Sequence, residues 1–135
     1  MMLRSLFIVL IAILSIAAVK NVPAQNREGS YGYKQGENAS GEVRVSNAND
    51  RSFRFKIGIG SRNPACVGEF SDRAHWIATN VAEYRFGMDD SHACRMIFVF
   101  SGNDLIVREC GCGNFHGAAC SFEATYTRSP RSNKK

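Results

Sequence analysis

Residues 94–110 read CRMIFVFSGNDLIVREC and decide the fold, because two apolar stretches flank a short turn signal. Ser101-Gly-Asn-Asp104 supplies turn residues, and alternation on either side is typical of a β-hairpin. One face of the first arm carries Cys94, Met96, Phe98 and Phe100. Ile97 and Val99 lie on the other face, which predicts a central strand covered on both sides.

The same alternation recurs along the chain. Val43 and Val45 precede a turn, and Phe53, Phe55, Ile57 and Ile59 follow it. Residues 65–70 and 74–79 indicate a strand interrupted at 71–73, and residues 120–127 predict a last strand. Its inward residues are Cys120, Phe122, Ala124 and Tyr126. We therefore expect an all-β domain, a small antiparallel barrel or sandwich of six to eight strands stabilised by disulfides.

The first 24 residues have the pattern of a signal peptide. Arg4 precedes an apolar run from Leu6 to Val19, about fourteen residues where a transmembrane helix needs about 20. Val22-Pro-Ala24 offers small residues for cleavage, so we expect the mature chain to start near Gln25. The sequence thus predicts a periplasmic or secreted protein without a transmembrane segment in its mature chain.

The remaining residues suit one modest domain. Residues 25–40 are polar and Gly-rich, which favours a linker or a loosely attached strand whose tyrosines dock on the core. The β domain is expected over residues 41–128, followed by a disordered basic tail over residues 129–135.

The mature chain is mildly basic. Without Arg4 and Lys20, 15 of the 17 Lys and Arg remain against 12 Asp and Glu, so the net charge falls from +5 to +3. Basic residues are spread along the sequence, and we expect no nucleic-acid partner. An alternative is an envelope-associated protein that binds anionic glycan or lipid through its basic surface.

All five cysteines lie in the expected mature chain, as in exported domains that add disulfides to a limited core. Strand parity favours a Cys66–Cys94 bridge. Cys110 and Cys112 are separated by one glycine, so one of them should pair with Cys120, and we choose Cys112. Cys110 would then be a free thiol, buried or available to link a dimer. Other pairings stay open.

The segment from Cys110 to Cys120 also contains His116, so three thiols and one imidazole lie close together. A Cys3His zinc site is therefore the alternative reading of this segment, which would make the chain a small metal-binding protein. We favour disulfides over a metal, because exported thiols are usually oxidised and the C-x-C spacing is unusual for zinc. We expect no metal and no cofactor.

Several enzyme classes lack their sequence signatures. The chain has no G-x-S-x-G nucleophile motif, no phosphate-binding loop and no H-E-x-x-H motif. His75 beside Trp76 is the one histidine considered as a general base, and a strand histidine more often has no catalytic role. We therefore expect a protein that is not an enzyme.

The order of strands and cysteines resembles small bacterial periplasmic β proteins of the lysozyme-inhibitor-like kind. The features that carry this resemblance are Gly41-Glu-Val-Arg-Val, residues 53–59, Cys66 with Gly68, Tyr84-Arg-Phe86, residues 94–100, and Cys112-Gly113 through Tyr126. The resemblance implies a compact barrel whose loops block a partner's active-site cleft. Candidate contacts are then the hairpin tip Ser101, Gly102, Asn103 and Asp104, and the segment from Tyr126 through Arg128 to Ser129.

The function we expect is that of a non-enzymatic binding module. Its partner would be a protein of the cell envelope, and inhibition of a cell-wall hydrolase such as lysozyme would be its task.

Overall fold

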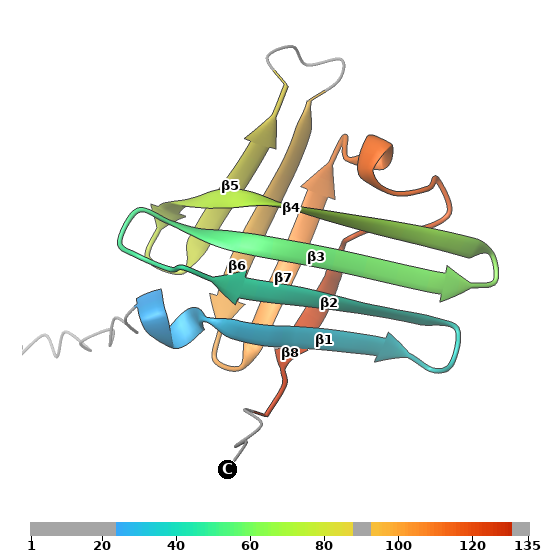
Figure 1. Ribbon diagram of the computed structural model, residues 1–135, viewed down its shortest axis with the longest axis horizontal. Helices are drawn as coiled ribbons and strands as arrows, with labels where there is room; N and C mark the ends of the chain where they lie inside the picture. The colour runs from blue at the N-terminus through green and yellow to red at the C-terminus, as the bar shows by residue number, and fades with distance from the viewer. Residues whose placement is uncertain (1–23, 88–92, 131–135) are drawn as a thin grey trace, which may run out of the picture.

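The structure is a computed structural model that describes residues 24–87 and 93–130. Its strands follow one another in chain order round a closed antiparallel barrel (Figure 1). They are β1 (Gly29–Gln35), β2 (Ala39–Ser46), β3 (Ser52–Arg62), β4 (Ala65–Ala78), β5 (Val81–Phe86), β6 (Cys94–Ser101), β7 (Asp104–Cys110) and β8 (Ala124–Arg128). Two 3₁₀ turns are η1 (Ala24–Arg27) and η2 (Gly113–Phe115). The prediction of a small all-β barrel is confirmed.

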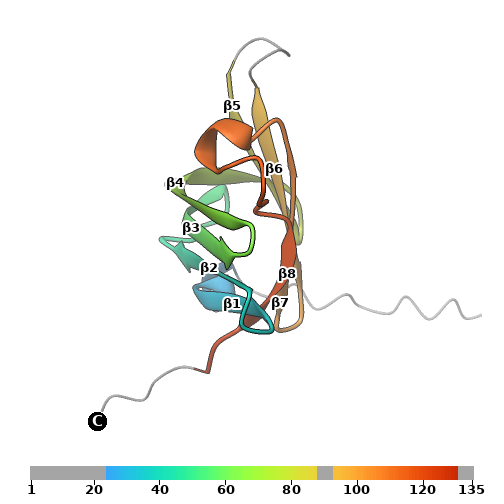
Figure 2. The same cartoon turned by 90° about the vertical axis from the view of Figure 1, so that its right-hand side faces the viewer.

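The strands form two groups that cross in Figure 1 and face each other in Figure 2. Strands β1 to β4 make one group, and β5 to β8 make the other. The long β4 joins them, because residues 65–75 pair with β3 whereas only residues 75–78 pair with β5. The first half of β4 therefore has a free edge, and one isolated bridge, Gly68 with His116, ties the η2 region to it.

Aromatic rings fill the barrel interior. The ring centroid of Phe98 lies 4.8 Å from that of Phe55 and 5.6 Å from that of Phe53, and all three side chains are buried. The predicted alternation of β3 and β6 is confirmed on this face. Ile97 and Val99 on the outer face of β6 are only partly buried, so the expectation of cover on both sides is wrong. A single-layered barrel leaves outward side chains facing water.

Of the two readings of residues 25–40, the linker is wrong and the strand whose tyrosines dock on the core is confirmed, because most of the segment is strand. β1 pairs with β2 along its whole length and closes the barrel against β8 through Tyr31 with Arg128 and Gly32 with Thr127. Tyr31 is almost fully buried, and its hydroxyl donates to the Arg27 carbonyl at 2.7 Å. The barrel therefore begins at Gly29 rather than Gly41.

Two strand boundaries also differ from expectation. β4 is continuous, because Ser71 to Arg73 pair in register with Lys56 to Arg54 of β3. The last strand starts at Ala124 rather than Cys120, because Ser121 accepts a hydrogen bond from the Glu123 amide at 3.0 Å and holds the preceding segment in a turn. Phe122 is nevertheless fully buried, as its inward position predicted.

A buried arginine occupies the barrel near η1. Arg27 is 6% exposed, donates to the Asn80 side chain at 2.6 Å and lies 4.5 Å from the Trp76 ring centroid. Burial lowers the pKa of the Arg27 guanidinium, while the cation–π contact and hydrogen bond compensate its lost hydration. Nothing in the sequence pattern marked Arg27 as an interior residue.

The expected leader lies outside the described residues except for Ala24, and so do residues 131–135 of the expected tail. Within residues 24–87 and 93–130, no helix is long and apolar enough to span a bilayer.

Candidate binding surface

The hairpin tip and the end of β8, the two candidate contact segments, lie next to each other. Ser101, Gly102 and Asn103 are exposed. The Arg128 amide donates to the Asn103 carbonyl at 2.8 Å, and the Thr127 hydroxyl donates to Asp104 at 2.8 Å. These bonds hold the tip against the strand end.

Tyr126 is not a surface residue, so its assignment as a partner contact is wrong. It is 0% exposed, its ring meets that of Tyr33 edge-on, and its hydroxyl donates to the Phe122 carbonyl at 2.8 Å. Burial raises the pKa of the Tyr126 hydroxyl above its usual value, and the nearby Tyr33 and Glu109 add to the shift. Its place on the inward parity of β8 already predicted this burial.

Arg128 is half-buried and largely committed to contacts within the barrel. Its Nη2 donates to the Tyr31 hydroxyl and to the Asn26 carbonyl, both at 2.5 Å, and its guanidinium lies 5.1 Å from the Tyr31 ring centroid. These contacts fasten the N-terminal segment to β8, which leaves only part of Arg128 for a partner.

A depression of about 1030 Å³ crosses β8 and β1 to β4 and ends at η2. We call it the trough. Five glycines line it, and those with open space above them, Gly32, Gly58 and Gly60, make its floor, whereas Gly41 is covered by Tyr33 and Ile59 and Gly68 by His116. Register places Thr127, Gly32, Glu42, Gly58 and Glu69 in one row across the sheet. The row has side chains at its ends and centre and bare backbone between them.

The glycines at Gly58 and Gly60 have open space where a side chain would be. A Cβ at Gly60 would meet nothing nearer than the Cys66 carbonyl at 4.0 Å, and one at Gly58 nothing nearer than the Glu69 carboxylate at 3.7 Å. Glycine in a strand interior weakens the strand and often marks a close approach of another chain. The open glycines at these two positions therefore favour binding more than folding.

The rim of the trough carries charges of both signs and exposed apolar atoms. Lys34 and Arg128 contribute positive charge, and Glu42 and Glu69 contribute negative charge. Val67 is 79% exposed, and the half-buried Phe115 lies at the η2 end. Mixed polar and apolar surface of this kind suits a segment of protein.

Sequence reasoning missed the trough. The signal available to it was the spacing of Gly58 and Gly60 at outward positions of a strand whose inward positions are apolar. The contribution of β1 and β4 could not be read in this way, because it depends on how their registers align with β3.

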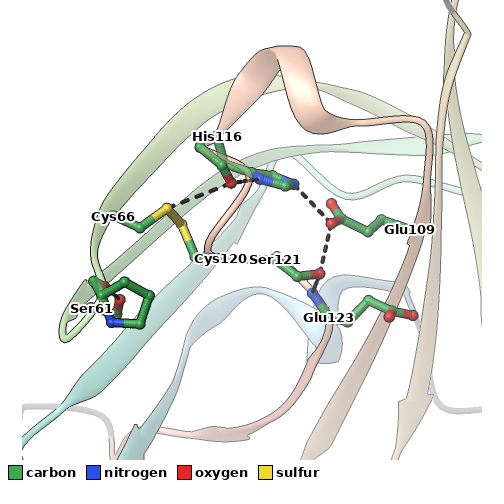
Figure 3. Close-up of a disulfide and its surroundings, with 9 residues drawn as sticks. Ser61, Cys66, Glu109, His116, Cys120, Ser121 and Glu123 are labelled. Atoms are coloured by element: carbon green, nitrogen blue, oxygen red, sulfur yellow. Dashed lines mark hydrogen bonds and ion pairs between the residues drawn. A yellow bond between two sulfur atoms is a disulfide. The ribbon is translucent and has the colours of Figure 1, made fainter.

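A second set of polar side chains, Glu109, His116 and Ser121, lies next to η2 (Figure 3). Glu109 is the centre of this set, since one of its carboxylate oxygens contacts His116 Nε2 at 2.8 Å and accepts from the Ser121 hydroxyl at 2.6 Å. The side chains of Glu109 and His116 are 10% and 7% exposed. His116 Nδ1 faces the Gly117 carbonyl at 2.8 Å.

The arrangement of these three residues differs from a nucleophile–base–carboxylate triad. In a triad the histidine lies between the nucleophile and the carboxylate. Here Ser121 bonds to Glu109 directly, and both nitrogens of His116 face acceptors, so neither is free to take the serine proton. The network fastens the segment between β7 and β8 to the barrel instead.

Removing the Ser121 hydroxyl should destabilise the protein without other consequence. Ser121→Ala deletes the bond to the buried Glu109 carboxylate, a kind of bond that contributes about 1.5 to 3 kcal/mol, together with the bond from the Glu123 amide. The change is measured by urea titration, with Ser129→Ala at an exposed position as the control. Equal stability of the two variants would show that the network does not hold this segment.

The same four cysteines that were expected to form disulfides do form them, but the expected pairing is wrong. Cys66 bonds to Cys120 and Cys94 bonds to Cys112, with Cα separations of 5.9 and 4.4 Å. Cys110 is free and exposed. In the strand register Cys66 lies opposite Ser61 of β3, whereas Cys94 lies opposite Phe86 of β5. The expected Cys66–Cys94 bridge would therefore have to join separate parts of the barrel.

Gly111 explains why Cys110 is exposed while Cys112, two residues later, is buried. It has φ +73°, and a Cβ there would lie 2.1 Å from the Ala93 carbonyl oxygen. Only glycine fits this close approach and this left-handed conformation. The resulting bend buries Cys112 and leaves Cys110 outside.

The zinc alternative loses its ligands in this arrangement. Cys112 and Cys120 are each bonded to another sulfur, so they carry no thiolate. Across the described ranges, His, Cys, Asp and Glu form no group of three or more suited to a metal ion.

Comparison of the chain with protein-family models, with curated proteins and with solved structures finds no match.

Proposed function

We propose that the protein is a non-enzymatic binding module of the periplasm or the extracellular space, and that a protein of the cell envelope is its partner. A cell-wall hydrolase such as lysozyme is the partner we consider first, and inhibition is the effect. The trough is the observation that carries this proposal, because a glycine floor admits a partner's loop close to the backbone.

The scaffold beneath the trough supports a binding role. A closed barrel with a continuous aromatic core presents the trough without rearrangement, and a pre-formed surface loses little entropy on binding. The hairpin tip at Ser101 to Asp104 lies beside the β8 end of the trough and can extend the contact.

The disulfides support the proposed compartment. Two disulfides persist in oxidising surroundings and are rare in the reducing cytoplasm. The leader pattern of residues 1–24 supports the same location. A monomer is the proposed state, and the exposed Cys110 thiol is where a disulfide-linked dimer would form.

The non-enzymatic part of the proposal is supported by the polar network. Glu109, His116 and Ser121 are the most enzyme-like grouping among the described residues, and their bonds hold one another rather than a reacting group. The trough itself holds no histidine and no cysteine.

Filling the trough should abolish partner binding while leaving the fold intact. Gly60→Trp places an indole over the floor, where the backbone is extended and the space is open. We expect affinity for a lysozyme, and inhibition of its cell-wall lysis, to fall by at least about tenfold, or 1.4 kcal/mol. The measurement is calorimetric titration together with a turbidity assay.

Thr125→Trp is the matched control, because Thr125 is an exposed strand position outside the trough. It should bind and inhibit as the unmodified protein does. Equal binding by both variants would place the partner elsewhere on the barrel. Failure of the unmodified protein to form a 1:1 complex with any cell-wall hydrolase tested would refute the choice of partner.

A further inference from the structure

The fold gathers basic residues that are far apart in the sequence. Arg44 of β2, Arg54 and Lys56 of β3, and Arg73 of β4 are all exposed. Arg44 lies opposite Lys56, and Arg54 lies opposite Arg73. We call these four residues the basic block. It lies on the same strands as the trough, displaced along them towards the other end of β3.

Such an arrangement costs stability. Like charges directly opposite each other on neighbouring strands are destabilising. Arg44 forms an ion pair with Glu42 at 3.1 Å, and Lys56 forms one with Glu69 at 2.9 Å. These pairs offset the repulsion between Arg44 and Lys56. Among the described residues, the guanidinium groups of Arg54 and Arg73 have no such acidic partner, and that of Arg73 donates to the Ser52 hydroxyl at 3.0 Å. The unrelieved charge therefore points to a ligand that supplies the anions.

We propose that the basic block binds an anionic polysaccharide through its phosphate or sulfate groups. Arginine presents a planar fork that matches such oxyanions in a bidentate way. Arg54 and Lys56 are about 6.7 Å apart along one strand, and neighbouring strands are about 4.8 Å apart, so several anionic groups of one polymer can be met at once.

The neighbours of the block favour a polymer over a bilayer. Ser46 lies opposite Arg54 and Ser71 lies opposite Lys56, so one hydroxyl ends each row of two cations. No apolar side chain interrupts these two rows, whereas interfacial membrane binding usually inserts apolar residues between headgroups. Hydroxyl and guanidinium groups together suit the hydroxyls and anions of a glycan.

This proposal is independent of the protein partner. Gly60 lies in the trough and outside the block, so Gly60→Trp should keep polysaccharide binding even where it abolishes hydrolase binding. Loss of one activity without the other is the expected pattern.

The test measures binding of a labelled heparin oligosaccharide by fluorescence polarisation. The variant Arg54→Ser/Arg73→Ser should bind about tenfold more weakly than the unmodified protein, and added salt should weaken both. The control is Arg62→Ser/Arg108→Ser, which removes two exposed arginines outside the block and changes the net charge equally. It should change the affinity by less than about twofold.

Because Arg73 contacts Ser52, the pair Arg44→Ser/Arg54→Ser is measured as well, and it should show the same loss. Thermal unfolding midpoints check that each variant is folded. Equal weakening by the control pair would overturn the proposal, because binding would then depend on net charge alone. Tighter binding to phosphatidylglycerol vesicles or to duplex DNA than to heparin would overturn it too.

Discussion

Replacing Phe98 with alanine should lower the free energy of unfolding by about 3 to 5 kcal/mol, the range for a large aromatic removed from a packed core. Phe98 is fully buried and packs against Phe53 and Phe55 from across the barrel. Its loss leaves a cavity where the two groups of strands meet. Denaturant titration measures the change, and Phe55→Ala should behave in the same way.

Val99→Ala is the control for this prediction. Val99 is the next residue of β6 and faces outward, where it is only partly buried. Its truncation should cost less than about 1 kcal/mol, since little buried surface and no cavity are involved. A loss of under about 1 kcal/mol for Phe98→Ala, or the reverse order of the two variants, would show that the assigned faces are wrong.

The two disulfides should differ in their contributions to stability. Cys66–Cys120 spans 54 residues and Cys94–Cys112 spans 18. Loop-closure entropy then gives about 4 kcal/mol for the first and about 3 kcal/mol for the second. We expect Cys66→Ser/Cys120→Ser to lower the free energy of unfolding more than Cys94→Ser/Cys112→Ser.

Cys110→Ser is the matched control for the disulfide variants, because Cys110 is exposed and free. It should change stability by no more than about 0.5 kcal/mol. Non-reducing peptide mapping and thiol counting should find one free thiol, at Cys110. A large effect of Cys110→Ser, or a Cys66–Cys94 peptide, would contradict the pairing described here.

The fold class was predictable because its strongest signals are local. The hairpin around Ser101 to Asp104 and the alternation from Phe53 to Ile59 each specify a strand face without knowledge of the rest of the chain. β1 was left open between a linker and a loosely attached strand, because its signal is not local. Its glycines and polar residues read as a linker, and only pairing with both β2 and β8 makes it a strand.

The cysteine pairing could have been predicted from the hairpin. A turn that places Ser101 opposite Asp104 also places Arg95 opposite Cys110, so Cys94 falls one residue away from the position opposite Cys112. Once Cys94 is paired with Cys112, the exposed Cys110 leaves Cys120 for Cys66. Parity alone was misleading, because inward-facing cysteines on different strands need not be neighbours.

The trough and the basic block could not be predicted from the sequence, for a different reason. Each depends on the alignment of three or more strands, and a slip of one residue would move Gly58 or Arg54 to the other face. Basic residues spread evenly along a chain can therefore become a block once the register is fixed.

A titration of the isotope-labelled protein with purified lysozyme, followed in amide NMR spectra, tests the central claim most directly. Saturable binding in a 1:1 ratio should shift the amide signals of Gly32, Gly58 and Gly60, which form the trough floor, and leave that of Thr125 unchanged. Shifts confined to residues outside the trough, or no saturable binding to lysozyme or to any other cell-wall hydrolase, would contradict the claim.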